Sequence, residues 1–199
     1  MEIEKALAQI QEIHGHLARS EVYRGYRSLP MAFTGMIGLL ASVAQPWIVD
    51  PDSPAAFLRY WATVCVANVL VVGLDMIYDY HVHLAPRDRR MTRQVVSQFI
   101  PCLVAGAFLT LVFARGHDVA LLPGLWALVF SLGAFASRPY LPRGVGWVAL
   151  YYLVCGCVLL ALAQSQASLA AWSMGASFGL GQLFLATVLY WNLERRTNG

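Results

Sequence analysis

One run of ionisable and amide side chains could do chemistry in an otherwise apolar sequence. Asp75, Asp79 and His83 follow one another at intervals of four residues, and Asn68 precedes Asp75 by seven. On an α-helix these intervals place all four side chains along one face. A carboxylate near the centre of a membrane costs at least ~2.5 kcal/mol. We therefore expect this face to point into a helical bundle rather than toward lipid.

Three functions are compatible with this polar stripe. They are a path for protons or cations, a site for a small polar ligand, and a metal site that uses Asp79 and His83. A fourth interpretation is structural, because Asp75 or Asp79 could pair with an arginine and fix the packing of the helices. The counter-charge candidates are Arg27, Arg93 and Arg138. The sequence specifies neither a cofactor nor a particular metal.

Enzyme signatures are missing from the sequence. There is no GxSxG, HExxH, P-loop or glycine-rich dinucleotide turn. Asp75 and Asp79 have the spacing of aspartate pairs that hold a magnesium-bound diphosphate, but no second acidic cluster occurs in the apolar segments. We therefore favour a protein without catalytic activity over an enzyme with a membrane-embedded site.

The composition indicates which elements must position the stripe. Of the 199 residues, 58% are hydrophobic and 13% are charged, whereas an ordinary soluble domain has about 25% charged residues. A soluble chain of this length could not bury so much apolar surface in its core. A formal net charge of +3 is too small to indicate binding to nucleic acid. The lipid bilayer is the expected surrounding.

Six apolar stretches have about the ~20 residues that a bilayer core requires. They cover residues 29–49, 58–82, 94–114, 119–137, 145–164 and 168–191. The connections are short, so consecutive helices should be antiparallel neighbours. The sequence thus predicts an all-α, polytopic membrane bundle of six transmembrane helices over residues 29–192. Residues 1–28 should form a cytoplasmic amphipathic segment, and residues 193–199 a short cytoplasmic tail.

The basic residues predict the orientation. Arg59 and Arg115 fall on one side of the predicted topology, and the other twelve of the fourteen lysines and arginines fall on the opposite side. Because basic residues concentrate in cytoplasmic loops, both termini should be cytoplasmic. The expected location is the inner (cytoplasmic) membrane, crossed several times.

The N-terminal segment suggests a second kind of function. Residues 2–21 form a predicted amphipathic helix with Ile3, Leu7, Ile10 and Leu17 on one face. Such a helix could dock a cytoplasmic protein. Two hypotheses therefore stand side by side. One is a small membrane protein that binds or transports an ion, a proton or a polar ligand through the stripe. The other is a regulatory or assembly subunit that recruits a cytoplasmic partner.

The last apolar stretch contains Gly175 and Gly179 in a GxxxG spacing. Small residues at this spacing let two helices approach closely, so we interpret them as a packing face rather than a pore lining. The sequence leaves open whether they pack within the chain or against a second copy of it.

Overall fold

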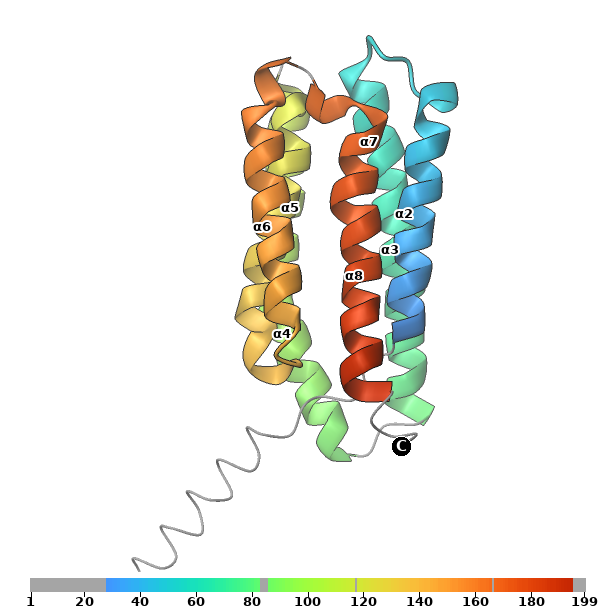
Figure 1. The fold of residues 1–199 in the computed structure, drawn as a ribbon, viewed down its shortest axis with the longest axis vertical. Coiled ribbons are helices and arrows are strands. Elements are labelled where there is room, and N and C mark those ends of the chain that lie inside the picture. Colours follow the sequence, from blue (N-terminus) through green and yellow to red (C-terminus); the bar gives the residue numbers. More distant parts are fainter. Residues whose placement is uncertain (1–27, 83–85, 117, 166, 195–199) are drawn as a thin grey trace, which may run out of the picture.

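The computed structural model describes residues 28–82, 86–116, 118–165 and 167–194, and the regular elements in these ranges are all helices. The long helices run side by side along one axis as a bundle (Figure 1). The predicted amphipathic helix 2–21 lies outside the described residues, as does most of the predicted tail.

Five long helices form the first part of the bundle. They are α2 (Ser28–Ile48), α3 (Pro54–Val82), α4 (Pro86–Arg115), α5 (Leu122–Ser137) and α6 (Val145–Ala161). The last helical run is a succession of α7 (Ala171–Met174), the π-helical segment η5 (Gly175–Gly179), α8 (Leu180–Leu189) and the π-helical segment η6 (Tyr190–Glu194). Short 3₁₀ turns lie between these helices: η1 (Val119–Leu121), η2 (Arg138–Tyr140), η3 (Ala163–Ser165) and η4 (Ala167–Leu169).

Within the described residues, five helices are long and apolar enough to cross a membrane. They cover Ser28–Ile48, Pro54–Val82, Thr92–Arg115, Val119–Tyr140 and Ala171–Asn192. The remaining predicted span, 145–164, corresponds to α6, which has 17 residues and is followed by the 3₁₀ turn η3. It is therefore shorter than the ~20 residues that usually span a bilayer core. The chain is an all-helical protein with the make-up of a multi-pass membrane protein.

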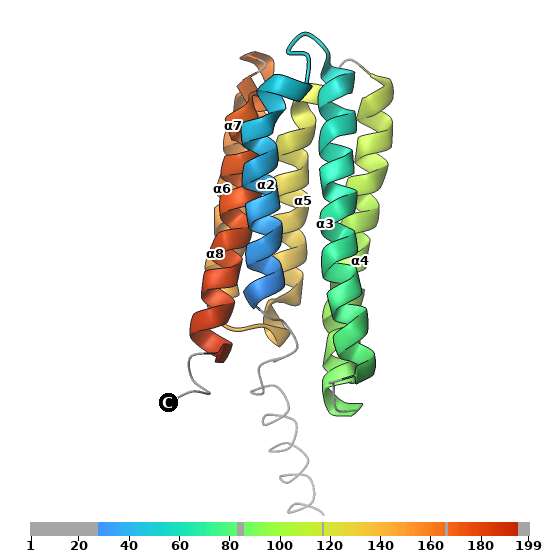
Figure 2. The same ribbon diagram turned by 90° about the vertical axis from the view of Figure 1, so that its right-hand side faces the viewer.

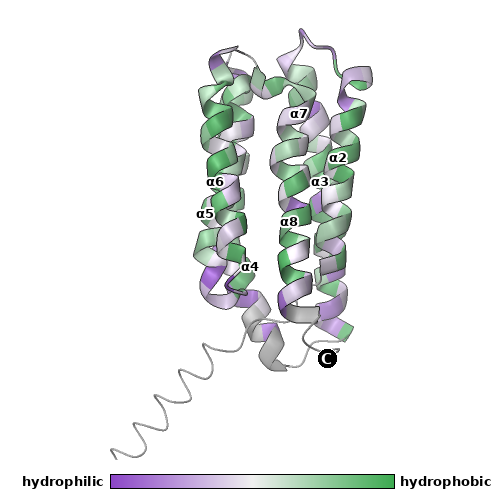
Figure 3. Cartoon of the chain, viewed as in Figure 1, coloured by the Kyte–Doolittle hydropathy of each residue, from purple (hydrophilic) through white to green (hydrophobic). Residues whose placement is uncertain are grey.

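Short connections make successive helices antiparallel, so every second connection falls at the same end of the bundle (Figure 1). We call one end the Arg-rich end, because it holds Arg89, Arg93, Arg138 and Arg143; the far end holds Arg59 and Arg115. Hydrophobic residues cover the lengths of the helices, and hydrophilic residues gather toward the two ends (Figure 3). This is the distribution that a bilayer imposes on a helical bundle.

The helices are packed to different degrees. The most extensive contacts are those of α5 with α6 and of α2 with the last helical run, and α4 packs against α5. Contacts of α2 with α3 and of α6 with α8 are fewer, and α3 and α4 scarcely touch. Helices α3 and α4 together form one side of the bundle (Figure 2).

Small residues permit the close contact between α2 and the last helical run. A Cβ added at Gly38 would lie 3.2 Å from the Cα of Gly179, and one added at Gly179 would lie 2.7 Å from Leu39 Cδ2. Gly175 faces Ser42, whose hydroxyl donates a hydrogen bond to the carbonyl of Ala171. The GxxxG pair therefore packs within the chain, against α2.

Two hydrophobic clusters form the core. The first, the Tyr152 cluster, consists of Met31, Ala127, Val145, Val148, Tyr152, Leu185, Ala186 and Leu189. The second, the Trp61 cluster, consists of Ala41, Val49, Phe57, Trp61, Val119, Leu122 and Met174. The Tyr152 cluster reaches toward the Arg-rich end and the Trp61 cluster toward the far end, because each draws on the corresponding halves of the helices.

Candidate functional site

The polar stripe of the sequence lies on the one face of α3 that packs against the bundle. The buried residues of α3 are Phe57, Trp61 and Asp79, and helical spacing puts Asn68 and Asp75 in line with them. Both of these side chains are half-buried. The rest of α3 is mainly exposed, as a lipid-facing surface would be.

Asp79 is the most buried charged group among the described residues of the stripe, with 8% of its surface exposed. Asp75 and Asp79 both take part in hydrogen-bonding or electrostatic interactions within the protein. This agrees with the rule that a carboxylate withdrawn from water needs compensating partners. His83, the fourth predicted site residue, lies outside the described residues.

Two of the three predicted counter-charges, Arg93 and Arg138, lie in the described part of the chain. Arg93 and Arg138 are exposed at the Arg-rich end, and no ion pair joins either of them to Asp75 or Asp79 within the described ranges. The guanidinium of Arg138 lies instead over Gly146, where an added Cβ would be 3.2 Å from its Nε. Arg27, the third candidate, lies outside the described residues.

A different arginine contacts this end of α3. Arg89, near the start of α4, places its guanidinium carbon 5.3 Å from the ring centroid of Tyr80, within cation–π range. Its Nη2 donates to the carbonyl of His81 at 3.4 Å. Arg89 falls between the predicted spans 58–82 and 94–114, so the sequence did not predict this contact. In the structure α4 begins at Pro86, well before residue 94.

The described part of the chain contains no group of three or more His, Cys, Asp or Glu side chains that could hold a metal ion. His81 is exposed, and its Nδ1 is 2.9 Å from the carbonyl oxygen of Ile77 in its own helix. A metal site of Asp79 and His83 therefore depends on a residue outside the described ranges.

Several buried oxygens in the described part of the bundle have no hydrogen-bond partner. They are Asn68 Oδ1, Ser137 Oγ, the Tyr152 hydroxyl and Gln182 Oε1. Buried polar atoms are nearly always hydrogen-bonded, so each such atom marks a place where a partner is expected. The sequence singled out Asn68 but missed Tyr152 and Gln182. Gln182 is the only amide side chain in the last apolar stretch, 168–191, and this could have identified it from the sequence.

The far end of α3 is, by contrast, held by satisfied polar groups. Trp61 Nε1 donates to Gln45 Oε1 at 2.9 Å, and Gln45 Nε2 donates to the carbonyl of Leu169 at 2.9 Å. The hydroxyl of Tyr60 donates to the carbonyl of Ala41 at 2.7 Å. A cavity of about 510 Å³ opens beside this network, and Asp50 and Asp52 line it. These contacts anchor α3 to α2.

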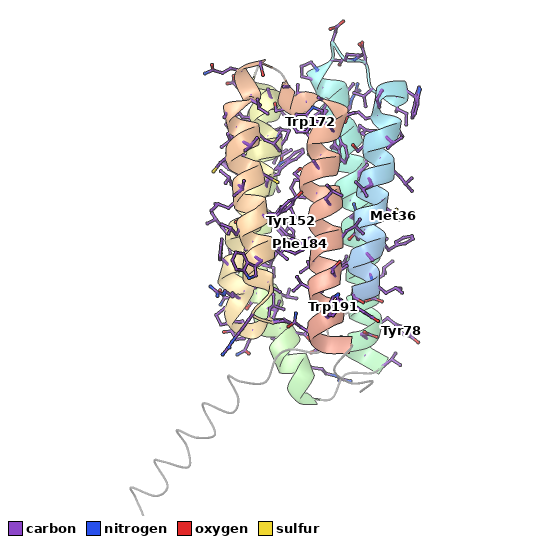
Figure 4. The ribbon with its side chains drawn as sticks, viewed as in Figure 1. Met36, Tyr78, Tyr152, Trp172, Phe184 and Trp191 are labelled. Carbon is purple, nitrogen blue, oxygen red and sulfur yellow. The ribbon has the colours of Figure 1, made fainter. Side chains whose placement is uncertain are left out.

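Aromatic rings form a layer across the interior. The ring centroids of Phe99 and Phe130 are 5.2 Å apart, those of Phe130 and Tyr152 are 4.5 Å apart, and those of Tyr152 and Phe178 are 5.4 Å apart. The layer thus extends from α4 through α5 and α6 to the last helical run. Figure 4 shows Tyr152 at about mid-height of the bundle, between α6 and the last helical run.

No protein-family model matches the chain, and no curated protein or solved structure is similar to it at a significant level. The arrangement of residues in the bundle is therefore the basis for assigning a function.

Proposed function

We propose that this protein is a six-span membrane protein that binds or transports a small cation, a proton or a polar ligand through the stripe of α3. The stripe consists of Asn68, Asp75 and Asp79, and the predicted topology adds His83 at its end. We further propose that α6 is the sixth span and that the Arg-rich end faces the cytoplasm, because twelve of the fourteen basic residues fall there in the predicted topology.

The observation that carries this proposal is the burial of Asp79 on the packed face of α3. A helix that only had to face lipid would place no carboxylate there, since ionisable groups in membrane segments are costly and are functional candidates by default. The second carboxylate, Asp75, is one turn deeper on the same face. The two carboxylates therefore lie at two successive depths from the Arg-rich end.

The charges favour a cationic or proton-donating ligand over an anion. Within the described residues, the stripe presents two carboxylates and an amide oxygen to the interior, and no arginine or lysine lies on this face of α3. Arg89 lies over the ring of Tyr80 at the Arg-rich end. Carboxylate and amide oxygens accept hydrogen bonds and attract positive charge, so a cation or a hydrogen-bond donor is the ligand class that suits the stripe.

The test is native mass spectrometry of the full-length protein released from nanodiscs, with elemental analysis of the same sample. We expect a bound small molecule or ion at a defined stoichiometry, and its loss in Asp75→Asn. Asp118→Asn, which removes an exposed carboxylate near the far end, is the matched control and should keep the bound mass.

The opposite result would favour the second hypothesis from the sequence. A chain that carries only lipid, or a second protein, would contradict ligand binding by the stripe and support a regulatory or assembly subunit. Deletion of residues 2–20 should then release the partner protein, and a pulldown unchanged by this deletion would exclude docking through the N-terminal segment.

A further inference from the structure

Three of the unpartnered oxygens belong to different helices of the bundle. They are Asn68 Oδ1 on α3, the Tyr152 hydroxyl on α6 and Gln182 Oε1 on α8. Ser137, the fourth, is the last residue of α5 and lies at the Arg-rich end.

Tyr152 is completely buried, with 0% of its surface exposed. A Cβ added at Gly181 would lie 2.6 Å from its hydroxyl oxygen, so this hydroxyl reaches the backbone of α8 through the space that a glycine leaves. The adjacent Tyr151 is different, because its hydroxyl donates to the carbonyl of Ala176 in η5. The hydroxyls of both tyrosines thus approach the last helical run, but only that of Tyr151 has a hydrogen-bond partner there.

Gln182 points to the interior because of its place between two packed faces of α8. Gly181 faces Tyr152 of α6, and Leu183 faces Gly35 of α2. At about 100° per residue, Gln182 falls between these two directions. The opposite side of the helix holds Leu180 and Phe184, which are 50% and 37% exposed.

Asn68 lies at the boundary between the two core clusters. Val64, one turn before it, packs against the Trp61 cluster, and Val72, one turn after it, packs against the Tyr152 cluster. Phe178 packs against both clusters, and Gln182 follows Phe178 by one turn. The three oxygens therefore lie within about one helical turn of one another along the bundle axis.

The chemistry of these atoms restricts what they can bind. The two amide oxygens only accept hydrogen bonds and the hydroxyl can accept one, so a partner with several hydrogen-bond donors would satisfy all three atoms. The faces of the aromatic layer, formed here by Phe130, Tyr152 and Phe178, also attract cations. An alkali ion would need its whole hydration shell replaced by oxygens, which is more than three side chains supply. A primary ammonium group has three N–H donors, as many as there are unpartnered interior oxygens.

We propose that Asn68, Tyr152 and Gln182 bind the primary ammonium group of a small amine at mid-depth, and that the carboxylates of α3 lead to this site. The inference rests on the proposed function and names its ligand class. Asp75 is two turns from Asn68 on the same face, about 10 Å along the helix, and lies between Asn68 and the Arg-rich end. The aromatic layer lies beside the site and closes the interior toward the far end.

The test measures the melting temperature of the full-length protein in nanodiscs by its tryptophan fluorescence. The probe is methylammonium chloride, compared at equal ionic strength with potassium chloride and with tetramethylammonium chloride, which has the same charge but no N–H donor. We expect a saturable rise of about 5 °C with methylammonium alone, as binding to the folded state would cause at concentrations well above Kd.

Three variants locate the effect. Tyr152→Phe removes only the unpartnered hydroxyl, and Gln182→Leu removes an unpartnered amide, so each should shift the methylammonium midpoint at least tenfold while the protein still folds. Tyr151→Phe is the matched control, because its hydroxyl is bonded to Ala176, and it should leave the midpoint unchanged. An equal response to potassium, a lack of response to methylammonium, or a midpoint insensitive to both Tyr152→Phe and Gln182→Leu would overturn the proposal.

The variant Asp75→Asn separates this proposal from the proposed function. If Asp75→Asn loses a ligand detected by mass spectrometry while Tyr152→Phe keeps it, the stripe binds a ligand but the mid-depth ammonium site is wrong. If methylammonium stabilises the protein through Tyr152 and Gln182 and Asp75→Asn has no effect, the ammonium site stands and the role proposed for the carboxylates of the stripe is wrong.

Discussion

Two groups of helices in this bundle are built on different principles. In the most apolar 18-residue stretches of Val119–Tyr140 and Ala171–Asn192, half of the residues are buried, whereas in those of α3 and α4 only 6% are. The first group is joined by glycines and close backbone contact, and α3 is joined to α2 largely through hydrogen bonds near the far end. The carboxylates therefore sit on the helix with the weakest packing, where a displacement of the helix would disrupt the fewest contacts.

The largest effect should come from widening the contact between α2 and the last helical run. We expect Gly179→Leu to reduce the free energy of unfolding by ~3 kcal/mol or more, the upper range for overpacking, because even a Cβ at this position would be 2.7 Å from Leu39 Cδ2. Gly73→Leu on α3 is the control: an added Cβ there meets nothing within 4 Å.

The control variant should be neutral or stabilising by up to ~1 kcal/mol, since leucine favours helix more than glycine does. Both variants would be compared by thermal unfolding in the same detergent. Equal destabilisation by both variants would show that the exposed side of α3 is covered, for instance by a second copy of the chain. The two groups of helices would then not differ in how tightly they are packed.

A smaller effect should follow from removing the anchor of α3. Gln45→Leu leaves Trp61 Nε1 and the carbonyl of Leu169 without partners, and each buried unpartnered group costs ~1–3 kcal/mol. Hydrogen–deuterium exchange should increase in the half of α3 near the far end before it increases in α5 or α6. Gln164→Leu, an exposed glutamine in η3, should change neither stability nor exchange, and an equal loss in both variants would refute the anchoring role.

The smallest effect concerns the attachment of α4. Trp126 Nε1 donates to Thr110 Oγ1 at 2.8 Å and so links α5 to α4. Thr110→Val should lower the stability by ~1 kcal/mol, the usual net value of a hydrogen bond. The matched control is Thr63→Val, because the Thr63 hydroxyl bonds only within its own helix, to the carbonyl of Arg59. A melting-temperature difference of less than 1 °C between these variants would contradict the link.

The helical architecture was predictable because hydropathy and helix length share one physical cause, the thickness of the bilayer. The predicted spans 29–49 and 58–82 differ by only a few residues from α2 and α3. The prediction for 145–164 was less accurate, since the helix ends at Ala161 and a 3₁₀ turn follows. The apolar composition continues through that turn, so hydropathy alone does not mark the end of the helix.

The candidate site was predictable only where it follows one helix. The spacing of Asn68, Asp75 and Asp79 gives their common face, because helical geometry relates residues of the same helix. Tyr152 and Gln182 come from other helices, and their approach depends on Gly181 and on which faces of α8 meet α2 and α6. Such relations between helices are set by packing, and a single sequence does not specify them.

The π-helical segment Gly175–Gly179 controls the rotational phase of everything that follows it in the last helical run. A π-helical turn holds one residue more than the α-helical ladder around it, so α8 is rotated by roughly one position, about 100°, relative to a continuous α-helix. Gly175 and Gly179 within this segment face α2, whereas Gly181 after it faces Tyr152. The loss of a single residue from this segment would leave the composition of the span nearly unchanged. It would nevertheless turn Gln182 away from the interior. The protein would still insert in the membrane, but different side chains of α8 would contact α2 and α6.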